Sequence, residues 1–569
     1  SNANSSECPI TAPCTLTTSP TTVLTTNNNN AVATDGETTT FEVKITIPAN
    51  SNIGAYTLDI AYDETADQTP YIPPDQLTPT NNWVKAASDN TSAINSITGA
   101  SKDQFAVDID ANMIPIVNKA DDGTYPSSWC NYDAKQWCNA VTVKPTTLAK
   151  YQSDPAGTVI NEDDILGYWT YIPRYAYEVM RHSAIDQVVQ AQNFDIHFEK
   201  STTPKKAPAA TCSSSSGNAA KDYRTECSIS RTYPTASPYD TSTWATHPAF
   251  TLGTTELNGL WVGKFETTGV QRAPTVKPNS HANIFKHTGE FYYAAQRLGK
   301  TALDPSAGNT VSGMTQNSHN LANQNSIMLK NDQWGAIAYL SSSTYGAGVN
   351  NVQINAAYPT TSSDADGTSS RFGITGCGPS SSGSTGSYTD GTALSSSVTQ
   401  SNTACSQDIS RAYHGTLGQL ASSTNNVYGI YDLSGGTYEY VMGNLNATSS
   451  TAYMATMPNA NYFNIYPAPP FGTRPSWSSS TSEQYYNNDI CTWSTCGGHA
   501  LHETKTVQSV SSDVQSWGSD YSSFAYSGYP WFRRGGISGV GSGDGVFALH
   551  YGTGSADRSL GFRVVVGAF

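Results

Sequence analysis

The chain has little charge and no long hydrophobic run. Of its 569 residues only 13% are charged and 37% are hydrophobic. No apolar stretch approaches the roughly 18 residues that would span a bilayer, so we expect no direct insertion of this chain into a membrane. Ser, Thr, Asn, Gly and Tyr must form most of the surface, which is typical of strands and long loops rather than helical bundles.

The charge that is present is mostly negative. The chain carries 30 Lys and Arg against 45 Asp and Glu, a formal net charge of -15. Nucleic acids and anionic membrane surfaces repel such a chain. We therefore expect no nucleic acid among its partners.

Several familiar catalytic motifs are missing as well. The sequence contains no GxSxG, no HExxH and no GxGxxG fingerprint. The glycine-rich run from Gly535 to Gly545 lacks the lysine of a phosphate-binding loop. The sequence therefore offers no candidate for the chemistry that these motifs perform.

The cysteines form sequence-local pairs. There are ten of them, and an even number clustered in loops is typical of an oxidising compartment. We predict five disulfides, each closing a short loop, and an extracellular protein that is either secreted or anchored at the cell surface. The predicted pairs are Cys8 with Cys14, Cys130 with Cys138, Cys212 with Cys227, Cys377 with Cys405, and Cys491 with Cys496.

Only the last pair has a competing interpretation. The segment from Cys491 to Glu503, CTWSTCGGHALHE, fits a C-x4-C-x2-H-x2-H pattern with ligands that suit zinc. The four other local pairs favour a disulfide here. Zinc stays the open alternative at this position.

The N-terminal part differs from the rest of the chain. Hydrophobic and polar residues alternate over 39–48 and 55–62, as in antiparallel strands with one buried face. We predict a small all-β, sandwich-like module over 4–75. Residues 76–111, which continue a proline-rich stretch, are expected to be a linker and connecting segment.

The remaining region, 112–569, predicts a larger α+β domain. Two helical patterns accompany several strand patterns, so the helices would flank a curved antiparallel sheet. Ser/Thr-rich insertions interrupt the region near 200–246 and 360–403. The expected strands begin at Asn112 and cover Asn139–Val143, Tyr168–Ile172, Tyr175–Val179 and Gly259–Glu266, and the expected helices cover Asn283–Leu298 and Ser326–Leu340.

The stretch GIYDLSGGTYEYVMGN, Gly429 to Asn444, stands out because one carboxylate lies in an apolar setting. Its pattern predicts a short strand, a Gly-Gly turn and a second extended segment. Glu439 occurs where apolar residues surround it, and an isolated carboxylate there needs a cation or a set of hydrogen-bond donors.

This stretch resembles the GLY(N/D)(M/L)xGNxWEW core of the formylglycine-generating-enzyme family, also called sulfatase-modifying factors. The closing GFRVVV, Gly561 to Val566, resembles the terminal strand of that family. GLWVGKFE, Gly259 to Glu266, resembles a strand of bacterial surface and prophage proteins of the same fold. The resemblance implies a C-type-lectin-like domain over 112–569.

The resemblance also implies a structural calcium site. Asp432 and Glu439 would supply carboxylates, and Gly435 and Thr437 would supply carbonyl oxygens, which are ligands that calcium prefers. The alternative is that Glu439 accepts hydrogen bonds from buried backbone amides without any metal.

The active site of the namesake enzymes is not matched. Those enzymes bind copper through two cysteines that follow the RGG strand, whereas no cysteine follows Arg534–Gly536 here. Cys491 and Cys496 have the right spacing but lie upstream. We therefore expect a non-catalytic relative without copper, and a copper-dependent oxidase is an alternative.

In the resembling fold the loop between the RGG and GFR strands, Ile537 to Leu560, faces the ligand. Aromatic residues among Ser and Gly are typical of binding loops. We predict an exported bacterial adhesin-like protein that recognises a glycan or a protein, and a structural subunit of a pilus or phage-type tail fibre is the alternative. The predicted ligand-binding residues are Tyr529, Trp531, Asp544, Phe547, His550, Tyr551 and Arg558.

Overall fold

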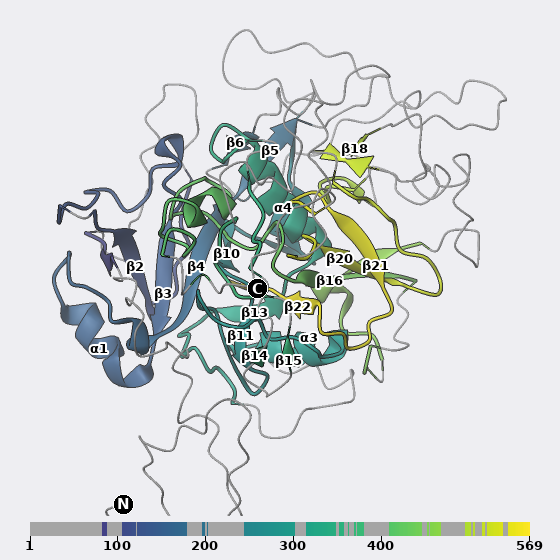
Figure 1. Cartoon of the computed structure of the whole chain (residues 1–569), viewed down its shortest axis with the longest axis horizontal. Coiled ribbons are helices and arrows are strands. Elements are labelled where there is room, and N and C mark those ends of the chain that lie inside the picture. Colours follow the sequence, from purple (N-terminus) through teal and green to yellow (C-terminus); the bar gives the residue numbers. More distant parts are fainter. Residues whose placement is uncertain are drawn as a thin grey trace, which may run out of the picture. The chain divides into compact units, whose positions relative to one another are not determined.

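Two β-sheets organise the part of the chain that the structure describes (Figure 1). The structure is a computed structural model, and these residues belong to one unit, Gln68–Phe569. The predicted β module over 4–75 lies outside the described residues, as do Cys8, Cys14, Cys212, Cys227 and Cys491. The described residues are 82–87, 105–120, 122–178, 196–199, 202, 244–301, 315–348, 352–357, 362–363, 369–370, 373–379, 405, 409–446, 452–454, 456–467, 496–501, 504–506, 515–517, 520–538 and 544–569.

The first sheet has seven strands, and every neighbouring pair is antiparallel. Most of its side chains are buried, so its strands have apolar residues on both faces. In spatial order the strands are β1 (Trp83–Lys85), β2 (Met113–Asn118), β3 (Asn139–Val143), β4 (Ile165–Pro173), β10 (Gly259–Gly263), β23 (Val564–Gly567) and β13 (Asn325–Met328).

The second sheet is built around β16 (Tyr438–Leu445). This strand pairs antiparallel with β20 and parallel with both β17 and β22, and β20 in turn pairs with β21. The partners are β17 (Asn464–Tyr466), β20 (Trp531–Arg534), β21 (Leu549–Gly552) and β22 (Leu560–Phe562). Because β22 and β23 belong to different sheets, the chain passes from one sheet to the other at Arg563.

Three α-helices lie in the described ranges: α1 (Pro145–Ser153), α3 (Thr288–Arg297) and α4 (Asn331–Ser342). The predicted helix over Asn283–Leu298 is confirmed but begins later, after His287, where Glu290 accepts a hydrogen bond from the His287 amide. The helix expected over Ser326–Leu340 is wrong at its start, because β13 occupies those residues and pairs with β23.

Shorter strands complete the described part of the chain. A three-stranded sheet contains β5 (Tyr175–Glu178), β6 (Ile196–Phe198) and β7 (Trp244–Thr246). The two-stranded pairs are β8 (Thr251–Leu252) with β9 (Thr255–Glu256), β11 (Thr268–Val270) with β12 (Ala273–Thr275), β14 (Ser362–Ser363) with β15 (Ser369–Ser370), and β18 (Lys505–Thr506) with β19 (Gln515–Ser516). Short 3-10 helices cover Tyr132–Ala134, Glu162–Asp164, Pro248–Phe250, Gly418–Ala421 and Ala460–Tyr462.

The mixed α+β class with predominant antiparallel sheet is therefore confirmed. The strand patterns at Asn139–Val143 and at Gly259–Glu266 give β3 and β10. Pro173 ends β4, so the aromatic segment continues as two strands, as expected from the missing N–H of proline. One edge strand, β1, comes from the segment expected to be a linker.

Two of the predicted disulfides lie in the described residues. Cys130 pairs with Cys138, and Cys377 pairs with Cys405. Cys496 is also disulfide-bonded. None of the described helices is long and apolar enough to cross a membrane.

Helix α4 approaches another segment closely at Gly335. A Cβ atom on Gly335 would lie 1.9 Å from the carbonyl oxygen of Gly498, which is backbone and cannot swing away. We expect Gly335→Ala to lower the free energy of unfolding by about 1–3 kcal/mol because the two segments must separate. Urea denaturation measures this loss. Gly528→Ala is the control, since its nearest neighbour would be the Tyr526 ring at 3.4 Å.

Candidate functional site

Glu439 and Arg563 form an ion pair between the two sheets. Both side chains are fully buried, and Nε of Arg563 lies 3.0 Å from one carboxylate oxygen of Glu439. A second guanidinium nitrogen, Nη2, contacts the other oxygen. The remaining donors of Arg563 bind the carbonyl oxygens of Gly263 at 2.8 Å and Tyr431 at 2.9 Å. Arg563 of the GFR motif is thus the partner that the sequence predicts for Glu439, and it is both a cation and a hydrogen-bond donor.

Two more buried carboxylates lie close to this pair. Asp432 accepts hydrogen bonds from Nδ2 of Asn355 and from the Gly376 amide, each at 2.8 Å. Glu266 accepts one bond from the Thr437 amide at 2.8 Å and one from its hydroxyl at 2.7 Å. We call Glu266, Asp432, Glu439 and Arg563 the carboxylate cluster.

Electrostatics in the carboxylate cluster favour protonation of the acids. Burial raises the pKa of Glu266 well above its usual value, and the charges of Asp432 and Glu439 raise it further. Burial also raises the pKa of Asp432 and Glu439, and Arg563 opposes this rise in both. Three carboxylates share one guanidinium, so the cluster holds an excess of acid over base.

The residues predicted to bind calcium thus have protein partners. Asp432 and Glu439 accept bonds from Asn355, Gly376 and Arg563, while Thr437 donates to Glu266. Asp432 and Gly435 both adopt positive φ, which shapes the turn before β16. The described residues contain no group of three or more His, Cys, Asp or Glu arranged to hold a metal ion. Calcium at this position stays a prediction.

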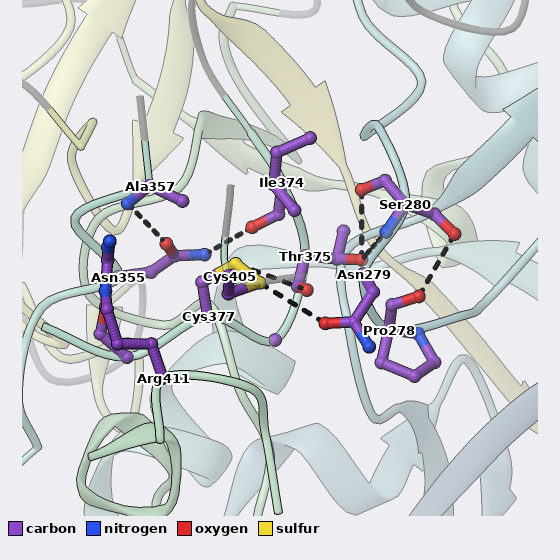
Figure 2. The surroundings of a disulfide bond; sticks show 12 residues. Pro278, Asn279, Ser280, Asn355, Ala357, Ile374, Thr375, Cys377, Cys405 and Arg411 are labelled. Carbon is purple, nitrogen blue, oxygen red and sulfur yellow. Dashed lines mark hydrogen bonds between the residues drawn. A yellow bond between two sulfur atoms is a disulfide. The ribbon is translucent and has the colours of Figure 1, made fainter. Parts of the chain in front are cut away.

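A disulfide joins Cys377 to Cys405 close to Asn355 and Ile374 (Figure 2). Cys377 follows Gly376, whose amide binds Asp432. Asn355 donates both to Asp432 and to the carbonyl oxygen of Ile374, at 2.8 Å each. The bond from Cys377 to Cys405 therefore helps to fix the backbone segment whose Gly376 amide binds Asp432.

The predicted ligand-binding residues fall on different sides of the second sheet. His550 and Tyr551 are consecutive in β21, and neighbouring side chains of a strand point to opposite faces. The structure therefore brings only some of the predicted residues together.

One side carries a trio of tyrosines. Tyr526 and Tyr529 lie on a turn before β20, with ring centroids 5.1 Å apart. Each ring also packs edge-on against Tyr551, at 5.0 and 5.2 Å. Tyr529 is 39% exposed, and the other two are half-buried. We call these three residues the tyrosine trio.

The other side carries His550 in a polar and aromatic setting. Its ring lies 4.5 Å from that of Tyr438 and stacks on Tyr521 at 4.5 Å. Arg533 lies over the Tyr438 ring at 4.8 Å. Burial and the charges of Arg533 and Arg534 lower the pKa of His550 well below its usual value, so the imidazole is neutral at pH 7.

Three predicted residues are buried instead of facing a ligand. Trp531 is 0% exposed, Phe547 packs edge-on against Trp517 in the core, and Asp544 is also 0% exposed. Burial raises the pKa of Asp544 well above its usual value, and the charge of Asp520 adds to this rise. The seventh residue, Arg558, is exposed and lies over the ring of Phe285 at 5.6 Å.

Arg534, the last residue of β20 and the first of the RGG motif, contacts the segment Cys496–Ala500, CGGHA. The sequence does not predict this contact. Nη2 of Arg534 donates to the carbonyl oxygens of His499 at 2.8 Å and Ala500 at 3.1 Å. Nδ1 of His499 is hydrogen-bonded to the Tyr466 hydroxyl, and Cys496 is disulfide-bonded rather than a free thiol. Cys491, the predicted partner of Cys496, and His502 lie outside the described residues.

Sequence reasoning did not assign Glu266 or Asn355 to this site. Glu266 closes the motif GLWVGKFE and is a second carboxylate in an apolar segment, which is the signal that identified Glu439. Asn355 has no such signal, because its role depends on a contact with Asp432 across 77 residues of sequence.

No protein-family model and no curated protein sequence matches this chain. The relation to formylglycine-generating enzymes therefore depends on the motifs described above and stays a prediction.

Proposed function

We propose that this chain is an exported, adhesin-like binding protein that recognises a glycan through the tyrosine trio. The observation that carries the proposal is the cluster of Tyr526 and Tyr529, on the turn before β20, with Tyr551 of β21. Tyrosine combines an apolar ring with a polar hydroxyl, so it can pack against a sugar and also bind its hydroxyl groups.

Rigidity of the trio supports this function. Each ring contacts the other two, and the amides of Tyr526 and Tyr529 each donate to the other's carbonyl oxygen, at 3.2 and 2.8 Å. Little side-chain entropy is then lost when a ligand binds. An acidic chain of net charge -15 also favours a neutral carbohydrate over an anionic partner.

Binding to an array of immobilised oligosaccharides tests the proposal. We expect the intact chain to bind at least one neutral glycan, and Tyr529→Ser to weaken that binding about tenfold, as for a residue at the centre of an interface. The variant should lose no more than about 1–3 kcal/mol of unfolding free energy, for its contacts with the Tyr526 and Tyr551 rings, and should stay folded under the binding conditions.

Tyr125→Ser is the matched control. Tyr125 has the same 39% exposure but lies in the segment before β3. Equal loss of binding in both variants would contradict a specific role of the trio. Absence of any bound glycan, together with capture of a protein through the same tyrosines, would replace the glycan by a protein ligand.

A further inference from the structure

Lys264 is a fully buried lysine that forms no ion pair with a described carboxylate. It directly follows β10, and its side chain is 0% exposed. Nζ donates to Oδ1 of Asn139 and to the carbonyl oxygen of Gly429, each at 2.8 Å. A buried ammonium without a counter-ion is strongly disfavoured, so this environment favours the uncharged amine.

The hydrogen bonds agree with an uncharged amine. Burial alone lowers the pKa of Lys264 well below its usual value. A neutral amine has two N–H donors, which match the oxygens of Asn139 and Gly429, whereas an ammonium has three. The ring centroids of Trp83 and Tyr431 lie 5.3 and 5.5 Å from Nζ, and Lys264 as a whole is 0% exposed. An uncharged amine in a dry setting is a nucleophile.

Asn139 presents its carbonyl side to this amine. Its Nδ2 donates to the carbonyl oxygens of Trp137 at 3.0 Å and Tyr428 at 2.8 Å, which fixes the orientation of the carboxamide. The Thr170 hydroxyl lies 3.5 Å from Oδ1, where it can donate to that oxygen.

The contact joins strands that are not neighbours. Asn139 begins β3 and Lys264 follows β10, while β4 lies between these two strands (Figure 1). The amide of Lys264 donates to the carbonyl oxygen of Tyr168 in β4, at 2.9 Å. The lysine side chain therefore reaches across one strand to the next.

We propose that Lys264 and Asn139 become joined by an intramolecular isopeptide bond. Rotation about Cε–Nζ turns the lone pair of Nζ toward Cγ of Asn139, and a bond forms between these two atoms. The Cγ–Nδ2 bond breaks, one hydrogen of the amine moves to Nδ2, and ammonia leaves. The Thr170 hydroxyl donates to Oδ1 while negative charge develops there. The step is a condensation, so it needs neither an oxidant nor a reductant.

The bond would be a covalent link across the centre of the first sheet. It would join residues separated by 125 positions in the sequence. Strands β3 and β10 could then not separate fully even when the chain unfolds. This inference is independent of the proposed glycan ligand and of the tyrosine trio.

The intact mass of the full chain, reduced and denatured, tests the proposal. We expect a mass about 17 Da below that of the sequence, the mass of one ammonia. A tryptic digest should contain one branched peptide with both Asn139 and Lys264, because trypsin does not cleave after a lysine whose amine is acylated. A mass equal to that of the sequence overturns the proposal, whatever the variants show.

Variants locate the bond. Lys264→Met should restore the full mass, while Lys300→Met, which changes an exposed lysine, should keep the deficit. In Asn139→Asp the lost molecule should be water, which changes the deficit to about 18 Da. A deficit that persists in Lys264→Met, or that maps to a peptide without Asn139, would show a different modification and also overturn the proposal.

Discussion

Arg563→Met is expected to lower the free energy of unfolding by about 3–5 kcal/mol, because it leaves the carboxylate cluster without its cation. Glu439 would have to stay charged without a partner or take up a proton, and Asp432 and Glu266 would no longer have a guanidinium nearby. Urea denaturation at pH 7 measures the loss. Glu439→Gln removes the carboxylate charge instead, and the side-chain carbonyl oxygen of the glutamine can still accept a hydrogen bond from Arg563.

The double variant Arg563→Met with Glu439→Gln separates charge from packing. We expect it to be more stable than Arg563→Met alone, because no unpaired carboxylate remains at position 439. The control is Lys150→Met, which breaks the surface pair between Lys150 of α1 and Asp154 at the end of that helix and should cost far less than Arg563→Met.

A loss of less than about 1 kcal/mol in Arg563→Met would contradict the importance of the buried pair.

Urea denaturation also tests the predicted calcium site. If a calcium ion lies at Asp432 and Glu439, a chelator should lower the stability of the intact chain, and added calcium should restore it.

Asp520→Asn is expected to make the stability of the chain depend less on pH between about pH 4 and pH 8. Asp520 lies under Gly545 and accepts a hydrogen bond from the Phe547 amide at 2.8 Å. Burial raises its pKa from 3.8 to about 8, although that hydrogen bond and the charge of Arg534 oppose the rise. The folded chain therefore holds a proton on Asp520 at pH 7 that the unfolded chain has lost.

The sign of the pH dependence follows from this difference. The folded pKa is raised, so the stabilising contribution is complete below pH 3.8 and disappears as the pH rises through about 8. The slope reaches about 1.4 kcal/mol per pH unit at most. Asp544 and Glu266 act in the same direction, since burial raises the pKa of each.

Urea denaturation at pH 5, 6, 7 and 8 tests this prediction. The intact chain should lose stability over this range, and Asp520→Asn should lose about 3 kcal/mol less. Asp122→Asn is the control, because its hydrogen bonds to Thr124 lower the pKa and its titration lies below this range. Parallel curves for the intact chain and Asp520→Asn would contradict the prediction.

Local sequence patterns predicted most of the strands and helices in the segments to which they were applied. The strand predicted over Asn139–Val143 matches β3 residue for residue, and the strand predicted from Gly259 matches the start of β10. The segment after Ser326 was misjudged because its apolar residues fit a helix until the pairing with β23 is known. A strand of four residues carries too little periodicity to compete with the helix that follows.

The binding residues show the limit of composition. The sequence marks the aromatic and polar residues around β20 and β21, but it does not say which of them face water. Trp531 and Phe547 are in the core, whereas Tyr529 is exposed and Tyr551 half-buried, because strand register and the turn at Tyr526 decide the direction of each side chain.

The sequence by itself determined the α+β class, the local cysteine pairs Cys130–Cys138 and Cys377–Cys405, and the need of Glu439 for a partner. Tertiary structure alone decided that the partner is Arg563, 124 residues away, and that Lys264 meets Asn139 across β4. The physical reason is the separation in sequence between the residues that interact. Strand periodicity and short disulfide loops depend on residues close in sequence, whereas buried charges take their partners from whatever strand the sheet order places beside them.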